Sequence, residues 1–170
     1  MNAHPGGEGH TRHMLEIATL PKGSRILDMG AGAGETVSLM QTLGYNAEGI
    51  DCAPRTDFIR QGDLLRTGLE KESFDAVLSQ CAFFVSGNVP QALREAYRLL
   101  KNNGLLLLSD VFFEDPVPQL KNAGFILLYQ EDLTEQWREY YLEALWKEEA
   151  LCCCIPKGKC SYWFLIGRKC

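Results

Sequence analysis

The sequence predicts an α/β fold in which a doubly wound, mostly parallel sheet carries helices on both faces. Three observations support this prediction. Segments with strand character alternate with segments of helical spacing along the chain of 170 residues. A glycine-rich turn, GAGAG, joins the first apolar strand directly to a helix. The apolar segments FDAVLSQCAFFV and GLLLLSDVFF lack the alternation of a strand with one exposed face.

The first half of the chain contains two predicted helices and four predicted strands. The apolar residues of the first helix share one face, and Pro21 ends it. The segment ETVSLMQTLG resumes helical spacing after the glycines, with Gly44 as its C-cap. The predicted elements are helices at 9–20 and 35–44 and strands at 24–29, 46–51, 58–63 and 74–85.

The second half repeats the alternation. A helix begins near Asn88 and stops before KNNG, and Thr134 is a candidate cap for the longest helix. The predicted elements are helices at 88–100, 117–124 and 134–153 and strands at 104–113, 125–133 and 160–169.

One connection is unusually short. A parallel crossover normally needs a dozen or more residues, but only CAPRTD separates the second strand from the third. We expect either a single-turn helix here or an irregular third strand.

Composition and charge limit the class of protein. One domain spanning residues 1–170 is expected from the length, and a net charge of −5 without a basic cluster argues against nucleic acid as a partner. No apolar run approaches the length of a membrane span, and the N-terminus lacks the apolar core of a signal peptide. We therefore expect a cytoplasmic protein with reduced thiols, either a monomer or a homodimer.

The glycine turn indicates a ligand without phosphates. Gly30, Gly32 and Gly34 allow positive φ and leave the backbone open to a ligand at the start of a helix. A dinucleotide fingerprint has the spacing G-x-G-x-x-G, which would place its third glycine at Glu35. An acid at that position would repel a pyrophosphate, so this spacing disfavours a dinucleotide.

Three acids at the ends of successive strands describe the ligand further. Asp28 precedes the glycines and suits an ammonium group, and Asp51 suits the hydroxyls of a ribose. Asp63 followed by Leu64 suits the exocyclic amine and the ring of an adenine. An amino acid, a ribose and an adenine together make up S-adenosylmethionine.

The motifs ILDMGAGAGE, GID, QGDL and FDAVLSQCAFF, in this order, resemble those of the class I S-adenosylmethionine-dependent methyltransferases, in particular the type 11 methyltransferase domain. The resemblance extends over about residues 15–132, and KCSYWFLIGRK resembles the last strand of that family. It implies a Rossmann-like, mixed seven-stranded sheet with an antiparallel last strand, and an N-terminal loop and helix, residues 1–20, that close over the cofactor. The implied cofactor-binding residues are Asp28, Gly30, Ala31, Gly32, Asp51, Cys52, Gly62, Asp63, Leu64, Ser79 and Gln80.

Methyl transfer from a sulfonium is an in-line displacement in which alignment and desolvation of the acceptor supply most of the acceleration, so a strong base is not required. If a base acts, the candidates follow the fourth and fifth strands: Cys81 and Asp110, with Ser79 and Gln80 beside them. The structural alternatives are that Cys81 fills the end of the strand and that Asp110 supports the site or caps a loop.

Histidines and cysteines offer weaker signals. One of His4, His10 and His13 could touch the substrate, or all three could be solvated. We expect no metal site, because the triplet Cys152, Cys153 and Cys154 has poor ligand spacing, although these residues with Cys160 and Cys170 could hold zinc or a metalloid.

The expected function is methyl transfer to a small molecule. Three alternatives stay open: an oxidoreductase that uses a dinucleotide, a non-catalytic regulatory protein that binds S-adenosylmethionine, and a thiol or metalloid methyltransferase that holds its substrate with the C-terminal cysteines.

Overall fold

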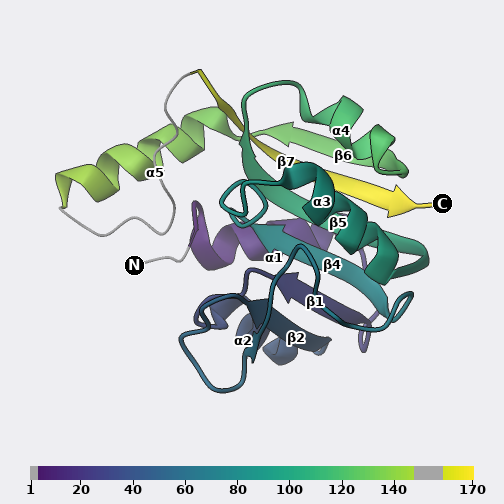
Figure 1. The fold of residues 1–170 in the computed structure, drawn as a ribbon. Coiled ribbons are helices and arrows are strands. Elements are labelled where there is room, and N and C mark those ends of the chain that lie inside the picture. Colours follow the sequence, from purple (N-terminus) through teal and green to yellow (C-terminus); the bar gives the residue numbers. More distant parts are fainter. Residues whose placement is uncertain (1–3, 148–158) are drawn as a thin grey trace.

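A computed structural model of the chain describes residues 4–147 and 159–170, which form a seven-stranded sheet with the order β3-β2-β1-β4-β5-β7-β6 (Figure 1). The strands are β1 (Arg25–Met29), β2 (Asn46–Asp51), β3 (Arg60–Gln61), β4 (Phe74–Gln80), β5 (Leu100–Phe112), β6 (Phe125–Asp132) and β7 (Ser161–Lys169). The helices are α1 (Gly7–Ala18), α2 (Glu35–Thr42), α3 (Val89–Leu99), α4 (Pro116–Asn122) and α5 (Thr134–Trp146).

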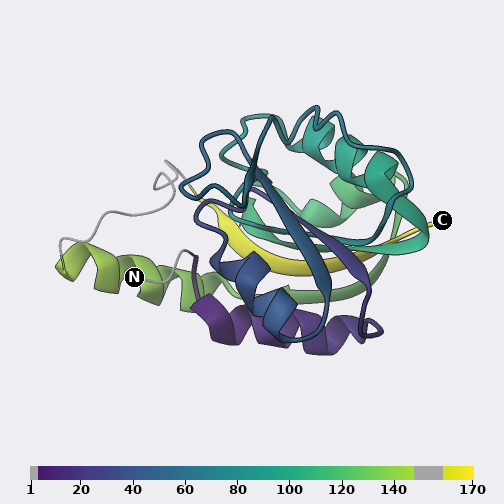
Figure 2. The ribbon, with the colours of Figure 1, turned by 90° about the horizontal axis from the view of Figure 1, so that it is seen from below.

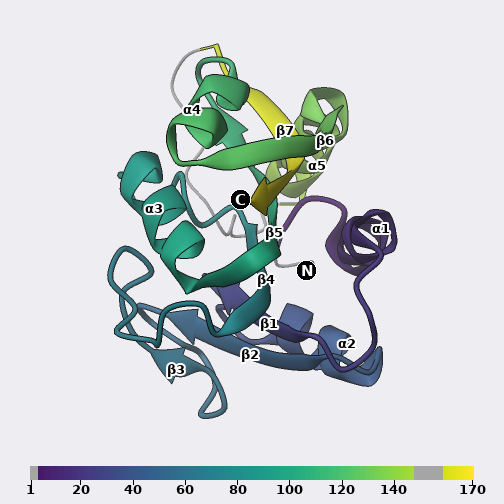
Figure 3. The same ribbon diagram turned by 90° about the vertical axis from the view of Figure 1, so that its right-hand side faces the viewer.

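The helices lie on both faces of the sheet, as the sequence predicts. Figure 3 shows α3 and α4 on one face and α1 and α2 on the other. Helix α5 packs against β7 at its start and then extends beyond the sheet (Figure 2).

Strand β7 confirms the predicted antiparallel insertion. It runs antiparallel to both β5 and β6, and the pairs β1·β2, β1·β4 and β4·β5 are parallel. The centre of the sheet is buried on both faces, because Leu106 and Leu108 of β5 pack into one apolar cluster and Leu107 packs into the other. This explains why the sequence of β5 is continuously apolar.

Two predicted strands are shorter in the structure. The strand predicted at 74–85 ends at Gln80, because Cys81 has a left-handed backbone with φ 58° and a turn follows. The strand predicted at 58–63 is reduced to Arg60–Gln61, and residues 52–59 contain no helix. Of the two expectations for the short crossover, the irregular third strand is correct and the single-turn helix is wrong.

Most helix ends agree with the sequence signals to within a few residues. Helix α1 ends at Ala18 because Thr19 adopts a left-handed conformation, and the Asn88 side chain caps α3 by accepting a hydrogen bond from the amide of Gln91. Strand β5 starts at Leu100, four residues before the predicted start. The predicted end of the last helix, 148–153, lies outside the described residues. Within the described ranges, no helix has the length and apolar character that a membrane span requires.

Candidate active site

A cavity of about 480 Å³ lies at the carboxyl ends of β1, β2 and β4. This is the edge of an open α/β sheet at which ligands bind. The structure brings most of the predicted site residues together in its wall: Asp28, Gly30, Ala31, Gly32, Asp51, Cys52, Asp63, Leu64, Gln80 and Cys81.

The glycine turn needs its glycines for two separate reasons. Gly30, Gly32 and Gly34 all have positive φ, at 96°, 52° and 81°. A Cβ on Gly30 would lie 2.2 Å from the Cβ of Ala82, so the turn and the segment after β4 are in direct contact. Only glycine allows both the positive φ and the close approach to Ala82. The amides of the turn therefore lie beside the cavity.

Asp51 fixes this turn at the end of β2. Its Oδ2 accepts a hydrogen bond of 2.8 Å from the amide of Gly32, and its Oδ1 accepts one of 2.9 Å from the amide of Ala53. Each carboxylate oxygen has a second lone pair, so Asp51 can hold the turn and still accept hydrogen bonds from a pair of ligand hydroxyls.

Asp28 is the most perturbed acid of the cavity. Its side chain lies in the wall and the residue is only 4% exposed. Burial, and then the charge of Asp51, raise the pKa of Asp28 to about 7, and no hydrogen bond from a described residue offsets them. A buried carboxylate without a donor is stabilised by a cation, so Asp28 favours a ligand with a positive group here.

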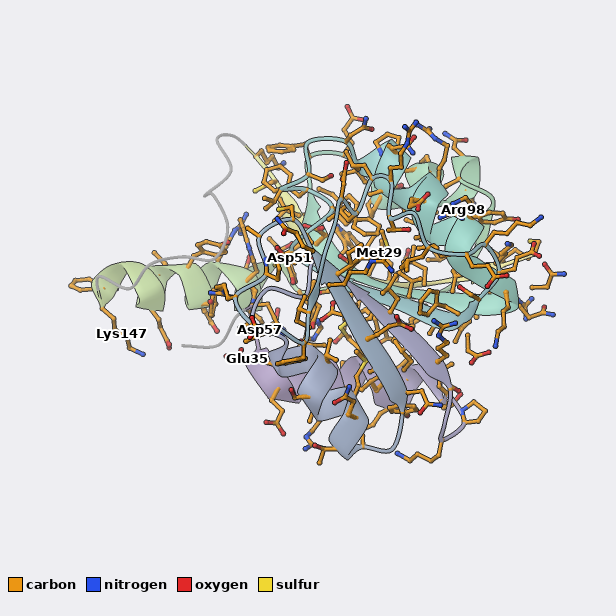
Figure 4. All side chains as sticks on the ribbon, turned by 60° about the horizontal axis from the view of Figure 1, so that its bottom comes forward. Met29, Glu35, Asp51, Asp57, Arg98 and Lys147 are labelled. Atoms are coloured by element: carbon orange, nitrogen blue, oxygen red, sulfur yellow. The ribbon has the colours of Figure 1, made fainter. Side chains whose placement is uncertain are left out.

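The cavity is acidic overall. Glu35 and Asp63 join Asp28 and Asp51 in its wall, and Arg55 contributes a positive charge. In Figure 4, Asp51, Asp57 and Glu35 lie along one side of the molecule, and Arg98 lies toward the other end. Four carboxylates around one cavity favour a cationic ligand over a pyrophosphate.

The short crossover forms part of the wall, which the sequence did not reveal. The amide of Arg55 donates to the Gly32 carbonyl at 3.1 Å, and the Thr56 hydroxyl donates to the Ala33 carbonyl at 3.2 Å. The ring of Phe58 covers Gly34, where a Cβ would lie 2.4 Å from the ring. The loop therefore holds the glycine turn in place. In the sequence, the only sign of this contact is that polar residues follow the short second strand.

Three predicted site residues lie outside the wall. The Ser79 hydroxyl donates to the Met29 carbonyl at 2.8 Å and ties β4 to β1. Gly62 lies against Ile50, where a Cβ would be 2.6 Å from its Cδ1. Asp110 accepts hydrogen bonds from the amides of Phe84 and Val111, so it anchors the turn after β4. Each of them supports the cavity from behind.

Comparison with known proteins shows which proteins the chain resembles. Residues 27–108 match the family model described as a methyltransferase domain. The chain is 28% identical over 149 residues to the uncharacterized methyltransferase YodH of Bacillus subtilis, covering 76% of this chain and 64% of YodH. It is 32% identical over 122 residues to the arsenite methyltransferase of Mus musculus, covering 56% of this chain and 32% of the mouse protein.

Residues 27–108 are thus similar to a methyltransferase domain, and the curated relatives named above are methyltransferases.

The fold of the methyltransferase domain is also that of solved relatives. A phosphoethanolamine N-methyltransferase 2 of Haemonchus contortus, solved in complex with S-adenosyl-L-methionine, superposes with a TM-score of 0.78 at 18% identity. The alignment covers 98% of this chain and 53% of that one. The chain thus spans about a third to two thirds of the length of the curated relatives described above.

The N-terminal segment of this methyltransferase domain reaches the cavity through Gln80. Gln80 Oε1 accepts hydrogen bonds from the hydroxyls of Thr11 in α1 and Thr36 in α2, at 3.2 and 3.4 Å. Its Nε2 lies 3.2 Å from Nδ1 of His4, which is buried and lines the cavity. One side chain at the end of β4 thus connects two helices and the segment before them.

None of the three histidines is a freely solvated imidazole. Burial lowers the pKa of His4 below its usual value, and His10 Nε2 lies 2.8 Å from the Ser109 hydroxyl. His13 Nε2 lies 2.8 Å from Oε2 of Glu131. The alternative of solvated histidines is therefore wrong, and His4 is the histidine in the cavity wall.

The cysteines of the chain lie in different places, and Cys170 is exposed. Cys52 and Cys81 line the cavity, and Cys160 packs against the apolar cluster that contains Cys81. Cys152, Cys153 and Cys154, proposed as ligands in the metalloid alternative, lie outside the described residues. Among residues 4–147 and 159–170, no three His, Cys, Asp or Glu side chains are placed so that they could hold a metal ion.

Proposed function

We propose that the protein transfers a methyl group from S-adenosylmethionine to a small-molecule acceptor. The observation that carries this proposal is the buried carboxylate of Asp28 in an acidic cavity beside the bare glycine turn. A ligand with an ammonium and a sulfonium group supplies the positive charge that this arrangement lacks. When bound, the cofactor supplies an electrophilic methyl group.

The residues present fit each part of that cofactor. Asp28 would pair with the ammonium group, and Asp51 would accept hydrogen bonds from the ribose hydroxyls. Asp63 lies at the wall with Leu64; its Oδ1 already accepts from the amide of Leu65 at 2.8 Å, and it retains a second oxygen for an exocyclic amine. We place the acceptor beside the segment that follows β4, because Cys81, Ala82, Val85 and Ser86 line the same cavity and none of them is assigned to the cofactor.

Calorimetric titration of the full chain with S-adenosylhomocysteine, and separately with NAD, tests the cofactor. We expect binding of the former alone, and its loss in the Asp28→Asn variant. The matched control is Asp115→Asn, because Asp115 caps α4 outside the cavity and an asparagine keeps that cap. Binding of NAD without S-adenosylhomocysteine would contradict the proposal and favour the oxidoreductase alternative.

Turnover separates an enzyme from a regulatory protein. Incubation with methyl-labelled S-adenosylmethionine and a broad panel of amines, thiols and hydroxylated small molecules should transfer label to at least one member. Tight binding of the cofactor without transfer to any member would favour the non-catalytic regulatory protein.

A trivalent metalloid is a second candidate acceptor. It is favoured by the similarity to an arsenite methyltransferase and by the thiol of Cys81 in the cavity wall, because soft thiolates bind soft metalloids. We expect arsenite to be methylated by the wild type and not by Cys81→Ser, with Cys170→Ser, an exposed cysteine outside the cavity wall, as the matched control. Chromatography coupled to elemental mass spectrometry distinguishes the products from arsenite. Methylation of other acceptors but not of arsenite would exclude this candidate.

We place the protein in the cytoplasm, as expected for a chain whose cysteines act as thiols.

A further inference from the structure

A chain of buried polar groups ends at the sulfur of Cys81. Cys81 follows β4, lines the cavity and is 8% exposed. Its Sγ lies 3.3 Å from the hydroxyl of Tyr162 in β7. The Ser109 hydroxyl of β5 lies 2.9 Å from the Tyr162 hydroxyl and 2.8 Å from Nε2 of His10 in α1. Four elements of the fold thus contribute to one line of contacts.

One arrangement of the protons that these contacts allow points toward the sulfur. Ser109 donates to the Tyr162 oxygen. The Ser109 oxygen is then left to accept from the Nε2 proton of His10, which burial keeps neutral by lowering its pKa to about 4. The remaining donor, the Tyr162 hydroxyl, has two acceptors in reach.

The sulfur is the better of those two acceptors. The Tyr162 hydroxyl lies 3.3 Å from Sγ of Cys81 and 3.4 Å from the carbonyl oxygen of Ser109. A distance of 3.4 Å is long for a bond between two oxygens, whereas 3.3 Å is close for a bond to sulfur. The Ser109 carbonyl is also occupied by the Cys81 amide at 2.9 Å. The donors His10, Ser109 and Tyr162 therefore follow one another toward Cys81.

Backbone geometry holds the sulfur in place. Cys81 has φ 58°, a left-handed conformation that residues with a Cβ rarely adopt. Such positions persist where the surroundings fix them and they concentrate at functional sites. Here the amide bond to Ser109 and the clamp between Gly30 and Ala82 fix the segment on both sides.

A second observation marks the same cavity as a binding site. The carboxylate of Asp28 is buried in the wall and receives no hydrogen bond from a described residue. The wall that contains Cys81 therefore faces a space built for a cationic ligand. A negative sulfur in that space would be stabilised by the same positive charge.

We propose that the protein presents Cys81 to the methyl acceptor as a thiolate, and that Tyr162, Ser109 and His10 are the positioning residues that keep it ionised. This inference rests on the proposed function. In the transfer step the thiolate takes the proton of the acceptor: the acceptor's bond to hydrogen breaks and an S–H bond forms. The electron pair released on the acceptor forms the bond to the methyl carbon, while the carbon–sulfur bond of the sulfonium breaks and leaves a neutral thioether.

A thiolate at Cys81 needs this chain of hydrogen-bond donors, because the groups around it disfavour a negative charge. Burial disfavours a thiolate, and carboxylates disfavour a second negative charge nearby. Burial is also the main reason that the pKa of Tyr162 is far above its usual value, so its hydroxyl remains a donor over the whole range in which a thiol ionises. The titratable groups that share the cavity with Cys81 are His4, Asp28, Glu35, Asp51, Cys52, Arg55 and Asp63. Those that share its apolar cluster or join its hydrogen-bonded chain are His10, Tyr140, Tyr141, Cys160 and Tyr162, and Asp110 holds the turn after Cys81.

Alkylation by iodoacetamide, followed at each cysteine by mass spectrometry between pH 6 and 10, tests the proposal on the full chain without cofactor or acceptor. The exposed Cys170 serves as the internal reference. We expect the rate at Cys81 to reach half its maximum at least about one pH unit below the value for Cys170.

Variants identify the positioning residues. In Tyr162→Phe the rate at Cys81 at pH 7 should fall about tenfold, because a hydrogen bond to a charged group is lost, and the midpoint should move up by about one unit. Ser109→Ala should give a smaller shift in the same direction. The matched control is Tyr129→Phe, because the Tyr129 hydroxyl donates to Glu131 and takes no part in the chain. A merely structural role for Tyr162 would change the maximal rate and leave the midpoint in place.

The outcomes are decisive. A midpoint for Cys81 equal to or above that of Cys170, no alkylation of Cys81 at any pH, or an unchanged midpoint in both Tyr162→Phe and Ser109→Ala would each overturn the proposal. If the Tyr162→Phe variant does not fold, the midpoints for Cys81 in the wild type and in Ser109→Ala still test the proposal. Failure of the proposed function is a different result: S-adenosylhomocysteine then does not bind, while the pH profile of Cys81 is still measured.

Discussion

The carboxylates of Asp28 and Asp51 share one wall of the cavity, and the charge of Asp51 adds to burial in raising the pKa of Asp28 to about 7. Asp51 is itself committed to holding the glycine turn, through the amides of Gly32 and Ala53. The two acids therefore differ in role. Asp51 holds the backbone of the glycine turn, whereas the carboxylate of Asp28 would be stabilised by a positively charged ligand. This difference leads to predictions about pH.

Binding of S-adenosylhomocysteine should weaken as the pH falls through 7. The ammonium group of the ligand pairs with the ionised form of Asp28, and the neutral form has no charge to offer. For a group with a pKa of about 7, the affinity at pH 6 should be about a tenth of that at pH 8. Calorimetry at both pH values measures this change. In Asp28→Asn the residual affinity should lack the pH dependence, and a wild-type affinity that is flat between pH 6 and 8 would contradict the assignment.

Asp28→Asn should make the ligand-free protein more stable above pH 7. The pKa of Asp28 is raised on folding, so its favourable contribution is complete below about pH 4 and is lost as the pH rises to 7. One pKa unit corresponds to about 1.4 kcal/mol, and an asparagine avoids the whole loss, so the gain is on the order of a few kcal/mol. Thermal melts at pH 4 and pH 8 compare the two proteins. A variant that melts lower than the wild type at pH 8 would show that Asp28 supports the fold.

Gly30→Ala should destabilise the protein and remove ligand binding. The new Cβ would lie 2.2 Å from that of Ala82, at a position with φ 96°. The matched control is Gly23→Ala, which has a similar φ of 80° but no atom within 4 Å of the added Cβ. The control should lose about 1–2 kcal/mol from backbone strain alone and keep its affinity. Equal losses of stability and affinity in both variants would mean that the contact with Ala82 is unimportant.

Gln80→Ala should release the N-terminal segment from the cavity. Gln80 is the shared partner of Thr11, Thr36 and His4, so its removal leaves the start of α1 without its bonds to the site. We expect faster amide hydrogen exchange in residues 4–11 and weaker binding of S-adenosylhomocysteine. The control is His13→Ala, which removes the contact of α1 with Glu131 on the far side of the helix from Gln80. If exchange in 4–11 is unchanged, the segment is held by other contacts.

Much of the fold could be predicted because each strong element has a local signal. The continuous apolar run of β5 and the Asn88 cap of α3 are visible in the sequence, and the glycine turn is placed by its own residues. The end of β4 could not be predicted. The run continues through Phe83 and Phe84, and nothing local shows that Cys81 leaves the strand in a left-handed conformation.

The site residues also divide into those that have a local signal in the sequence and those that do not. Asp28 and Asp51 were identified because acids at strand ends next to glycines have a fixed place in this kind of sheet. Sequence reasoning misses Arg55 because it lies in an irregular loop without a local signal, although it follows Asp51 by only four residues. It misses Tyr162 because that residue reaches the site from the distant strand β7. Ser79 was assigned to the wall because of its strand-end position, but the pleat of β4 turns its hydroxyl toward Met29 instead.

The loop that replaces a helix between β2 and β3 has a consequence for the rate of turnover. Residues 52–59 contact the glycine turn through Arg55 and Thr56, but Asp63, in the cavity wall, and the ring of Phe58 remain exposed. A nucleoside seated there would keep one edge in water and would have a short residence time. Spent cofactor could then leave without a large rearrangement of the chain, and the catalytic cycle would be limited by the chemical step rather than by product departure.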